Sequence, residues 1–415
     1  MEKVVELIEK YNGIINDFIW GLPMIILLLS VGIYFSIRLG FPQITKIKAI
    51  SKNIKRKENK ETKGNLSSIQ SFLVGLGGIV GSGNIAGVAT AIASGGPGAL
   101  FWMWIASFFG MATKFAEITL GIFYRKKTDD GYIGGPMYYL KDGVKSKFLA
   151  GAYAVLAILS YIVIVAMVDT NTIVSTITDK YAVNPWIIGV ILVVIVGIII
   201  FGGIKKIGNF SSKIVPFMGI FYILSGLLVI IFNIESVPHA LSVIITSAFK
   251  PQAAVGGFAG ATIMQIMRYG FARGIYSNEA GLGTAGITHS TAKVDHPIQQ
   301  ALWGPVEVFV DTIIICTISG IVVVISGEWI TGATGAPLIM SAFDKVLPGG
   351  IGSYLVMISS ILFSFTCLTS SGFICEQCAK YLFGEKRKNI IRVLWLVFIM
   401  IGAVTSLELA WNLAD

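Results

Sequence analysis

The chain has little charge and few cysteines, and each shortage argues against a common class of protein. Only 13% of its 415 residues are charged, whereas a soluble domain carries roughly 25%. Globular domains of this composition would lack the charge needed to cover their surfaces, and a disordered chain would be more polar still. Four cysteines in 415 residues are too few for a disulfide framework. These shortages together point to a membrane protein.

Recognisable catalytic and cofactor motifs are missing as well. The sequence has neither a P-loop nor a Gly-x-Ser-x-Gly nucleophile motif, and its three histidines lack metal-binding spacing. Cys375 and Cys378 form a lone Cys-x-x-Cys pair without a second pair of ligands nearby. The first residues mix acids with bases, and no signal-peptide cleavage site follows them. We therefore predict no enzyme, no cofactor and no cleaved leader.

Long apolar runs are what the sequence does contain. Apolar residues make up 54% of the chain, and its mean hydropathy is +0.78. A membrane-spanning helix needs about 20 apolar residues, and in lipid its backbone hydrogen bonds must close within the segment. Ten runs qualify: 18–37, 67–93, 98–124, 148–168, 186–204, 214–234, 252–274, 298–326, 354–374 and 393–411. Two shorter amphipathic segments, 237–249 and 335–347, are predicted to be surface helices on the outer side.

Positive charge alternates from loop to loop. Nine lysines and arginines lie between the first and second runs and six between the third and fourth, whereas the intervening loops hold few. Because lysine and arginine favour cytoplasmic loops, this pattern places the N-terminus outside and the odd-numbered connections in the cytoplasm, across the plasma membrane. The net charge of +9 therefore belongs to membrane loops, so the predicted partner is the lipid bilayer and not a nucleic acid.

The second run (67–93) and the seventh run (252–274) are poor helices. Six glycines crowd the second run: Gly75, Gly77, Gly78, Gly81, Gly83 and Gly87. Each costs on the order of 1 kcal/mol relative to alanine in a helix, and they fall on several faces, which favours an unwound stretch over close helix packing. The centre of the seventh run is interrupted by Gln265, Arg268 and Gly270. An arginine at this depth is costly and usually functional.

The two poor helices are five runs apart, so their topologies are inverted. Two interrupted helices at corresponding places in inverted halves are typical of a secondary transporter. The N-termini of half-helices favour an anion such as a carboxylate, and the freed carbonyl groups favour a hard cation such as sodium. A cation channel is the alternative from another class, but it would draw rings of acidic or carbonyl groups from several subunits.

Five stretches are similar to one known family: GSGNIAGVATAIASGGPGALFWMW (81–104), GGPMYYL (134–140), RYGFARGIYSNEAGLGTAGITHSTAKVDHP (268–297), VDTIIICT (310–317) and LFSFTCL (362–368). On these stretches the chain resembles the alanine or glycine:cation symporter family over nearly its whole length. The resemblance implies an all-α membrane protein of the leucine-transporter type, with two inverted five-helix repeats after one extra N-terminal helix. Residues 1–66 would hold that helix and a basic loop, 67–234 the first repeat, and 235–415 the second, with its last core helix absent from this chain.

The resemblance also implies sodium-driven import of a small neutral amino acid by alternating access, carried out by a monomer. The implied substrate-binding residues are Ser82, Gly83, Asn84, Asp169, Gln265, Gly270 and Ser371. The first three would offer backbone N–H groups to the substrate carboxylate. The implied sodium ligands are the carbonyls of Gly77, Val80 and Phe363 and the hydroxyl of Thr366. Alternatively, the Thr366 hydroxyl bonds back to its own helix, as is common.

Three residues depart from the family pattern. Asp169 stands where the family usually has glutamine, and a carboxylate there holds a substrate ammonium, binds a cation or takes a proton. Proton coupling through Asp169 is therefore an alternative, as is a position at the outer rim of the helix. Ser371 belongs to a Ser-Ser pair in place of Gly-Trp, which favours a side chain larger than alanine's methyl. Cys367 replaces a hydroxyl partner of sodium and is a poor ligand for a hard cation.

Two further pairs of charged residues lie within the apolar runs. Lys114 and Glu117 are three residues apart on one helix face, and we predict that they pair. Glu307 and Asp311 are four residues apart and alike in charge. They share a proton or neighbour a cation path, or else Asp311 braces a neighbouring helix.

Overall fold

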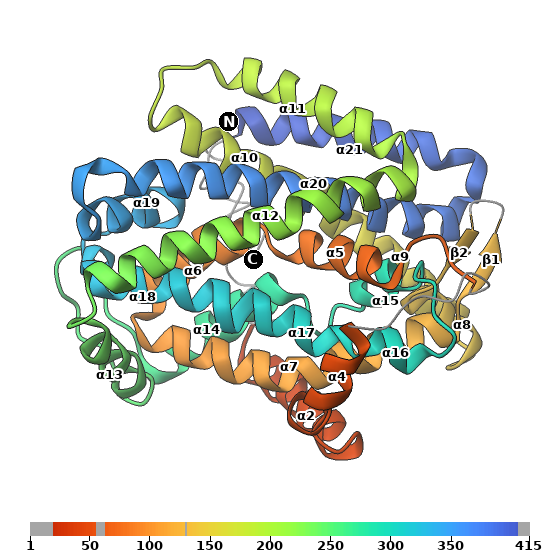
Figure 1. Ribbon diagram of the computed structural model, residues 1–415, viewed down its shortest axis with the longest axis horizontal. Helices are drawn as coiled ribbons and strands as arrows, with labels where there is room; N and C mark the ends of the chain where they lie inside the picture. Colours follow the sequence, from red (N-terminus) through yellow and green to blue (C-terminus); the bar gives the residue numbers. More distant parts are fainter. Residues whose placement is uncertain (1–19, 55–62, 129–130, 406–415) are drawn as a thin grey trace.

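The computed structural model describes residues 20–54, 63–128 and 131–405, and these are almost entirely helical (Figure 1). The exception is one antiparallel hairpin, β1 (Lys126–Thr128) and β2 (Gly131–Ile133), with Lys126 opposite Ile133. The start of the first predicted run and the end of the last lie outside the described residues.

The helices of the first part of the chain correspond to the first six apolar runs. They are α2 (Leu22–Arg38), α3 (Pro42–Thr45), α4 (Ile47–Ile54), α5 (Ser68–Ile79), η1 (Gly83–Gly87), α6 (Val88–Gly95), α7 (Gly98–Phe123), α8 (Pro136–Asp142), α9 (Lys147–Leu159), η2 (Ser160–Val165), α10 (Ala166–Thr178), α11 (Pro185–Ile200) and α12 (Gly203–Phe232). The turns η1 and η2 are π-helical.

The second part of the chain contains the remaining elements. They are α13 (Val237–Ser247), α14 (Ile263–Asn278), α15 (Thr284–His289), α16 (Pro297–Ala301), α17 (Trp303–Val308), η3 (Phe309–Cys316), α18 (Thr317–Ser326), η4 (Glu328–Ile330), α19 (Gly335–Val346), η5 (Pro348–Gly350), α20 (Gly352–Phe383), η6 (Glu385–Arg387) and α21 (Lys388–Val404). η3 is a third π-helical stretch.

Five helical segments of the described chain are long and apolar enough to cross a membrane. They are Gly98–Phe123, Lys147–Thr178, Gly203–Phe232, Pro297–Ser326 and Gly352–Phe383. The pair α5 and η1–α6, bent by 49°, makes a sixth. Each of the ten predicted runs contains a helix, but α2 and α11 are shorter apolar helices, so the count of ten spans stays a prediction.

The second run is broken as predicted. Ser67 starts α5 with a capping box, in which its side chain accepts from Gln70 N–H. The helix stops at Ile79, because Val80 takes an extended conformation with ψ 93°. α5 packs against α12 and α20, and in Figure 1 the two halves α5 and α6 lie near the middle of the bundle.

The seventh run is also broken, but the predicted position of the break is wrong. α14 starts only at Ile263, because Thr262 and Gln265 form a capping box there. The residues predicted to interrupt the helix therefore lie inside it. The break comes later, at Glu279, whose left-handed φ of 54° ends α14, and it continues through Gly281 and Gly283, with φ of 104° and 79°.

The fourth run extends further than predicted. Its helix continues through η2 and α10 to Thr178. The polar residues after Val168 remain helical because their hydroxyls bond back to carbonyls one turn earlier, for example Thr172 Oγ1 to Val168 O at 2.8 Å. Asp169 thus lies nine residues before the end of α10 and is 1% exposed. The alternative that placed it at the outer rim is wrong.

The two amphipathic segments form helices, as predicted, and α19 exposes one face, at Pro337, Ser341 and Lys345, while its apolar face is buried. Leu338, Ile339 and Phe343 are fully buried, and α19 packs against α18 and α20 and touches η1. Its apolar face therefore belongs to the core, next to the first break.

Candidate functional site

A cavity of about 240 Å³ lies where the two broken helices meet. It is lined by Trp20, Gly78, Ile79, Gly81, Ser82, Gly83, Ser160, Tyr161, Ile164, Val165, Asp169, Ile275, Tyr276, Glu279, Leu282 and Cys367. These residues come from the first break, η2, α10, the end of α14 with the second break, and α20. π-helical turns are frequent at functional sites, and η1 and η2 both adjoin this cavity.

Asp169 caps the first break. Ser82 N–H donates to Asp169 Oδ1 at 2.9 Å, and Gly81 N–H donates to Asn84 Oδ1 at 2.9 Å. A Cβ on Gly81 would lie 3.1 Å from Asp169 Oδ1 and 3.1 Å from Cys367 Cβ, so glycine is what permits this close approach. The Ser82 amide predicted to bind the substrate carboxylate is thus held by a carboxylate of the protein itself.

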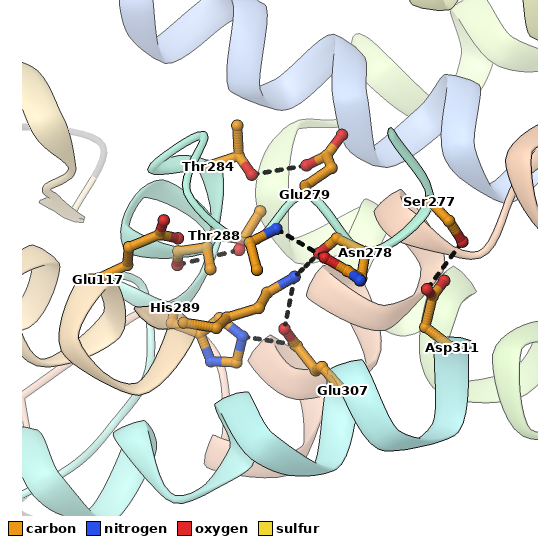
Figure 2. Close-up of polar contacts among 12 residues, drawn as sticks. Glu117, Ser277, Asn278, Glu279, Thr284, Thr288, His289, Glu307 and Asp311 are labelled. Atoms are coloured by element: carbon orange, nitrogen blue, oxygen red, sulfur yellow. Dashed lines mark hydrogen bonds and ion pairs between the residues drawn. The ribbon is translucent and has the colours of Figure 1, made fainter. Parts of the chain in front are cut away.

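The described lining of this cavity is acidic. It contains Asp169 and Glu279 but no lysine or arginine. The Glu279 carboxylate is held at both oxygens. Oε1 accepts from Tyr161 Oη at 2.7 Å, and Oε2 accepts from Thr284 Oγ1 at 2.6 Å (Figure 2). Lys114 donates to Asn278 O, next to Glu279, so Asp169 is the carboxylate of the lining that favours a cation or an ammonium group.

Asn84 lies outside the cavity lining and joins a separate buried network. Its Nδ2 donates to Asp311 Oδ1 at 2.6 Å and to Ser277 Oγ at 2.9 Å. Asp311 Oδ2 accepts from Ser277 Oγ and from Thr312 Oγ1, both at 2.8 Å. The Asp311 carboxylate therefore connects η1, α14 and η3, which favours the interpretation that it braces neighbouring helices. Figure 2 shows the contact with Ser277.

Three of the four implied sodium ligands, Gly77, Phe363 and Thr366, lie at the contact between α5 and α20. A Cβ on Gly77 would lie 3.6 Å from Thr366 Cβ. Thr366 Oγ1 donates to Phe363 O at 2.9 Å, which is the back-bonded arrangement named as the alternative. Cys367 Sγ donates to Gly78 O at 3.0 Å. Val80 is buried at the end of α5.

Besides Asn84, three of the implied substrate residues do not reach the cavity. Gln265 is exposed in the capping box that starts α14. Gly270 packs against α7, where a Cβ would lie 2.6 Å from Trp102 Cβ. Ser371 is buried one turn after Cys367, with its Oγ 3.6 Å from Cys367 Sγ.

A second buried cluster surrounds the second break (Figure 2). Lys114 Nζ lies 3.4 Å from Glu307 Oε2 and donates to Asn278 O at 2.7 Å. His289 Nε2 and Glu307 Oε1 are 2.6 Å apart. Glu117 Oε1 accepts instead from Gly281 N–H at 2.7 Å. The predicted pairing of Lys114 with Glu117 is therefore wrong: each side chain reaches the break from α7 and binds a different partner there.

Glu307 and Asp311 do not share a proton. They are on successive turns, but Glu307 faces Lys114 and His289, whereas Asp311 faces the hydroxyl and amide groups around Asn84. The two carboxylates thus fix two different parts of the second half of the chain.

The sequence reasoning missed three cavity residues. Tyr161 gave no signal, because it is an aromatic residue in an apolar run. Tyr276 and Glu279 lie in the YSNEAGLG segment (276–283), where glycines two and four residues after a carboxylate were a sign of the true break.

Comparison with known sequences gives a clear match. A family profile described as "Sodium:alanine symporter family" matches residues 5–415. The sodium/alanine symporter AgcS of Methanococcus maripaludis is 40% identical over 411 residues, covering 97% of this chain and 89% of that protein. The probable sodium/glutamine symporter GlnT of Bacillus subtilis is 36% identical over 412 residues, covering 99% and 85%.

Comparison with solved structures addresses the fold. MhsT in complex with L-phenylalanine matches with a TM-score of 0.61 at 13% identity, covering 84% of this chain and 81% of that one. A Na⁺-coupled sialic acid symporter in a substrate-bound outward-open state matches with a TM-score of 0.56 at 15% identity, covering 94% and 82%. The leucine-transporter-type fold expected from the sequence is thereby confirmed.

Proposed function

We propose, since the chain belongs to the sodium:alanine symporter family, that it imports a small neutral amino acid together with sodium by alternating access. Family and fold make it a multi-pass membrane transporter. The observation that carries the proposal is the cavity between the two breaks, lined by unwound backbone and by Asp169. We further propose the plasma membrane as its location, with the N-terminus outside, on the alternation of loop charge.

In this proposal the substrate ammonium binds the Asp169 carboxylate. The acidic lining of the cavity supports this, because an ammonium group supplies the positive charge that the described lining residues lack. The substrate carboxylate then takes backbone N–H groups at the start of η1, at Ser82 and Gly83, where the helix dipole favours an anion. Binding therefore requires Asp169 to exchange its own bond to Ser82 for one to the ligand.

Sodium binds between α5 and α20 in this proposal. The carbonyls of Gly77, Val80 and Phe363 and the Thr366 hydroxyl supply oxygen ligands, which a hard cation prefers. Thr366 Oγ1 already lies 2.9 Å from Phe363 O, so the two oxygens are close enough to face one ion. The ion would join the first broken helix to α20 and order the break for substrate.

Proton coupling through Asp169 is the second candidate. Its support is the position of the carboxylate, fully inside the protein, at the break and beside Cys367 in place of a hydroxyl. Under proton coupling, Asp169→Asn abolishes the pH dependence of uptake and sodium has no effect. If uptake by the Asp169→Asn variant still depends on the sodium gradient and keeps its pH profile, proton coupling through Asp169 is ruled out.

The test is uptake of a labelled amino-acid panel into proteoliposomes under sodium, potassium and proton gradients in turn. The panel includes alanine, glycine and glutamine, because relatives are named for alanine and for glutamine. We expect saturable uptake, with counterflow, driven by the sodium gradient alone. Uptake driven only by a proton gradient would make the proton, and not sodium, the coupling ion. Non-saturable ion flux without counterflow would favour a cation channel.

A further inference from the structure

A second cavity, of about 410 Å³, lies at the other end of α20, away from the substrate cavity. It is lined by Asn65, Thr128, Tyr132, Ile133, Phe201, Gly202, Gly203, Ile204, Lys205, Thr291, Phe373, Glu376, Gln377, Lys380, Lys388 and Arg392. None of these residues lines the cavity between the breaks. The walls are the turn from α11 to α12, the end of α20, the start of α21 and the β1–β2 hairpin.

The described lining of this cavity is strongly positive. Four cationic side chains, Lys205, Lys380, Lys388 and Arg392, and one carboxylate, Glu376, are the charged groups of the described lining. The carboxylate is already used: Glu376 Oε1 lies 3.0 Å from Lys380 Nζ, and Oε2 accepts from Arg392 Nε at 2.7 Å. These three groups are nearly buried, with side chains 7% exposed or less for Lys380 and Glu376 and 8% for Arg392.

The uncharged part of the lining also suits an anion. Tyr132 carries a hydroxyl and Gln377 an amide, and both can donate hydrogen bonds. The Thr128 and Thr291 hydroxyls already donate to Gly131 O and Thr288 O. Lysine and arginine at close range, backed by neutral donors, are the groups that recognise phosphate oxygens. Of the described lining residues only Glu376 would repel an anion, and its charge is offset by two cations.

The cavity opens at the level where lipid headgroups are expected. Its walls are helix ends next to two basic connections, after α11 and after α20, that the loop charges assign to the cytoplasm. Apolar side chains around it face outward: Phe201 is 47% exposed, Phe383 50% and Ile390 58%. In a membrane protein such residues contact acyl chains, and so the cavity adjoins the boundary between headgroups and hydrocarbon.

We propose that this cavity binds the phosphate group of an anionic phospholipid on the cytoplasmic face. A free phosphate compound has the same chemistry, but the exposed apolar side chains at the neighbouring helix ends favour the headgroup. Bound there, the lipid joins the α11–α12 turn, through Lys205, to the start of α21, through Lys388. The proposal does not depend on which substrate or ion the protein transports, because the two cavities share no residue.

The experiment is native mass spectrometry of the full-length, delipidated protein in detergent, titrated with phosphatidylglycerol or phosphatidylcholine. The test variant is Lys205→Gln with Lys388→Gln, which removes two cavity charges and leaves the Glu376 cluster intact. The control is Lys206→Gln with Lys386→Gln, which removes the same charge from exposed neighbours outside the lining. Size-exclusion profiles and melting temperatures establish that both variants are folded.

We expect the unaltered protein and the control to retain phosphatidylglycerol in preference to phosphatidylcholine. The cavity variant should bind phosphatidylglycerol on the order of tenfold to thirtyfold more weakly, from about 1 kcal/mol per lysine near an anionic surface. Equal loss in both variants would overturn the proposal, because general surface charge would then explain the binding. A separate titration with inorganic phosphate distinguishes the source: phosphate binding that depends on Lys205 and Lys388, without lipid retention, would overturn the assignment to a lipid.

Discussion

At the scale of single residues, Asp169 is the group on which the proposed site depends most. It is buried at the first break, it accepts from Ser82 N–H, and it lines the cavity. A carboxylate is an unusual choice for a site that must also bind the carboxylate of an amino acid, since the two groups repel. The conflict is resolved if Asp169 binds the substrate ammonium and releases the Ser82 N–H, which then donates to the substrate carboxylate.

The first prediction follows from this exchange. Asp169→Asn should raise the KM for amino-acid uptake about 10-fold to 100-fold, because a hydrogen bond to a charged group is worth roughly 1.5–3 kcal/mol. The measurement is sodium-driven uptake at a fixed, saturating sodium concentration. Asp179→Asn is the matched control, since that exposed residue follows the same helix. An unchanged KM would remove Asp169 from the substrate site.

Cys367 carries the second prediction. Its Sγ donates to Gly78 O beside the proposed sodium site, and sulfur is a poor ligand for a hard cation. Cys367→Ser should therefore lower the sodium concentration for half-maximal uptake several-fold. Cys375→Ser, on the same helix but outside the cavity lining, should not. A weaker sodium dependence in the Cys367 variant would place the ion elsewhere.

At the scale of helices, the cluster around Glu307 attaches α7 and α17 to the second break. Lys114 and Glu307 are both almost completely buried, and breaking a buried ion pair costs about 3–5 kcal/mol because a charge is left behind. Lys114→Met should therefore lower the melting temperature in detergent far more than Lys141→Met, which changes an exposed residue of α8. Adding Glu307→Gln to Lys114→Met should recover part of the loss, and a purely additive loss would contradict the ion pair.

Outside the spans, η4 and α19 are joined by Glu328. Hydrogen bonds from Lys345 and Ser341 lower the pKa of its carboxyl below the ordinary value. A depressed pKa means that the stabilisation is present above the pKa of the unfolded chain and is lost as the pH falls through the folded pKa. Glu328→Gln should thus lower the melting temperature slightly at neutral pH, since exposed pairs are worth at most about 1 kcal/mol. The difference should vanish in acid, and a constant difference would contradict this account.

The order of these helices was largely predictable, and the exact breaks were not. Apolar runs of about 20 residues mark helices because lipid forces the backbone to bond within a segment. The first break was found because six glycines crowd one run and fall on several faces of the helix. The second was misplaced, because the glycines at 256–260 and the polar residues at 265–270 looked like an interruption, whereas Thr262 and Gln265 start a helix. The polar residues from Asp169 onward predicted the end of a helix. α10 nevertheless continues to Thr178, with threonine hydroxyls bonded to carbonyls one turn earlier.

At the scale of the whole molecule, the two breaks belong to halves of opposite predicted topology and yet line one cavity. The sequence could predict which residue types would meet there, because the family motifs cover both breaks. It could not predict that Asp169 would accept a hydrogen bond from Ser82 N–H, since that contact joins residues 87 apart in the chain. The division into two five-helix repeats stays a prediction.

The last prediction concerns coupling across the whole site. In the proposed function, sodium at the α5–α20 contact orders the break whose amides bind substrate, so each ligand should strengthen the binding of the other. Reciprocity requires that sodium lower the substrate Kd by the same factor by which substrate lowers the sodium Kd, typically about 5-fold to 150-fold. Both factors are measured by equilibrium binding to the purified protein, with potassium replacing sodium as the control. Asp169→Asn should reduce the substrate's effect on sodium binding and leave sodium binding alone nearly unchanged, because that carboxylate faces the substrate and lies outside the proposed ligand set. Factors of one, with neither ligand changing the affinity for the other, would show that sodium does not order the substrate site, and the proposed coupling would then fail.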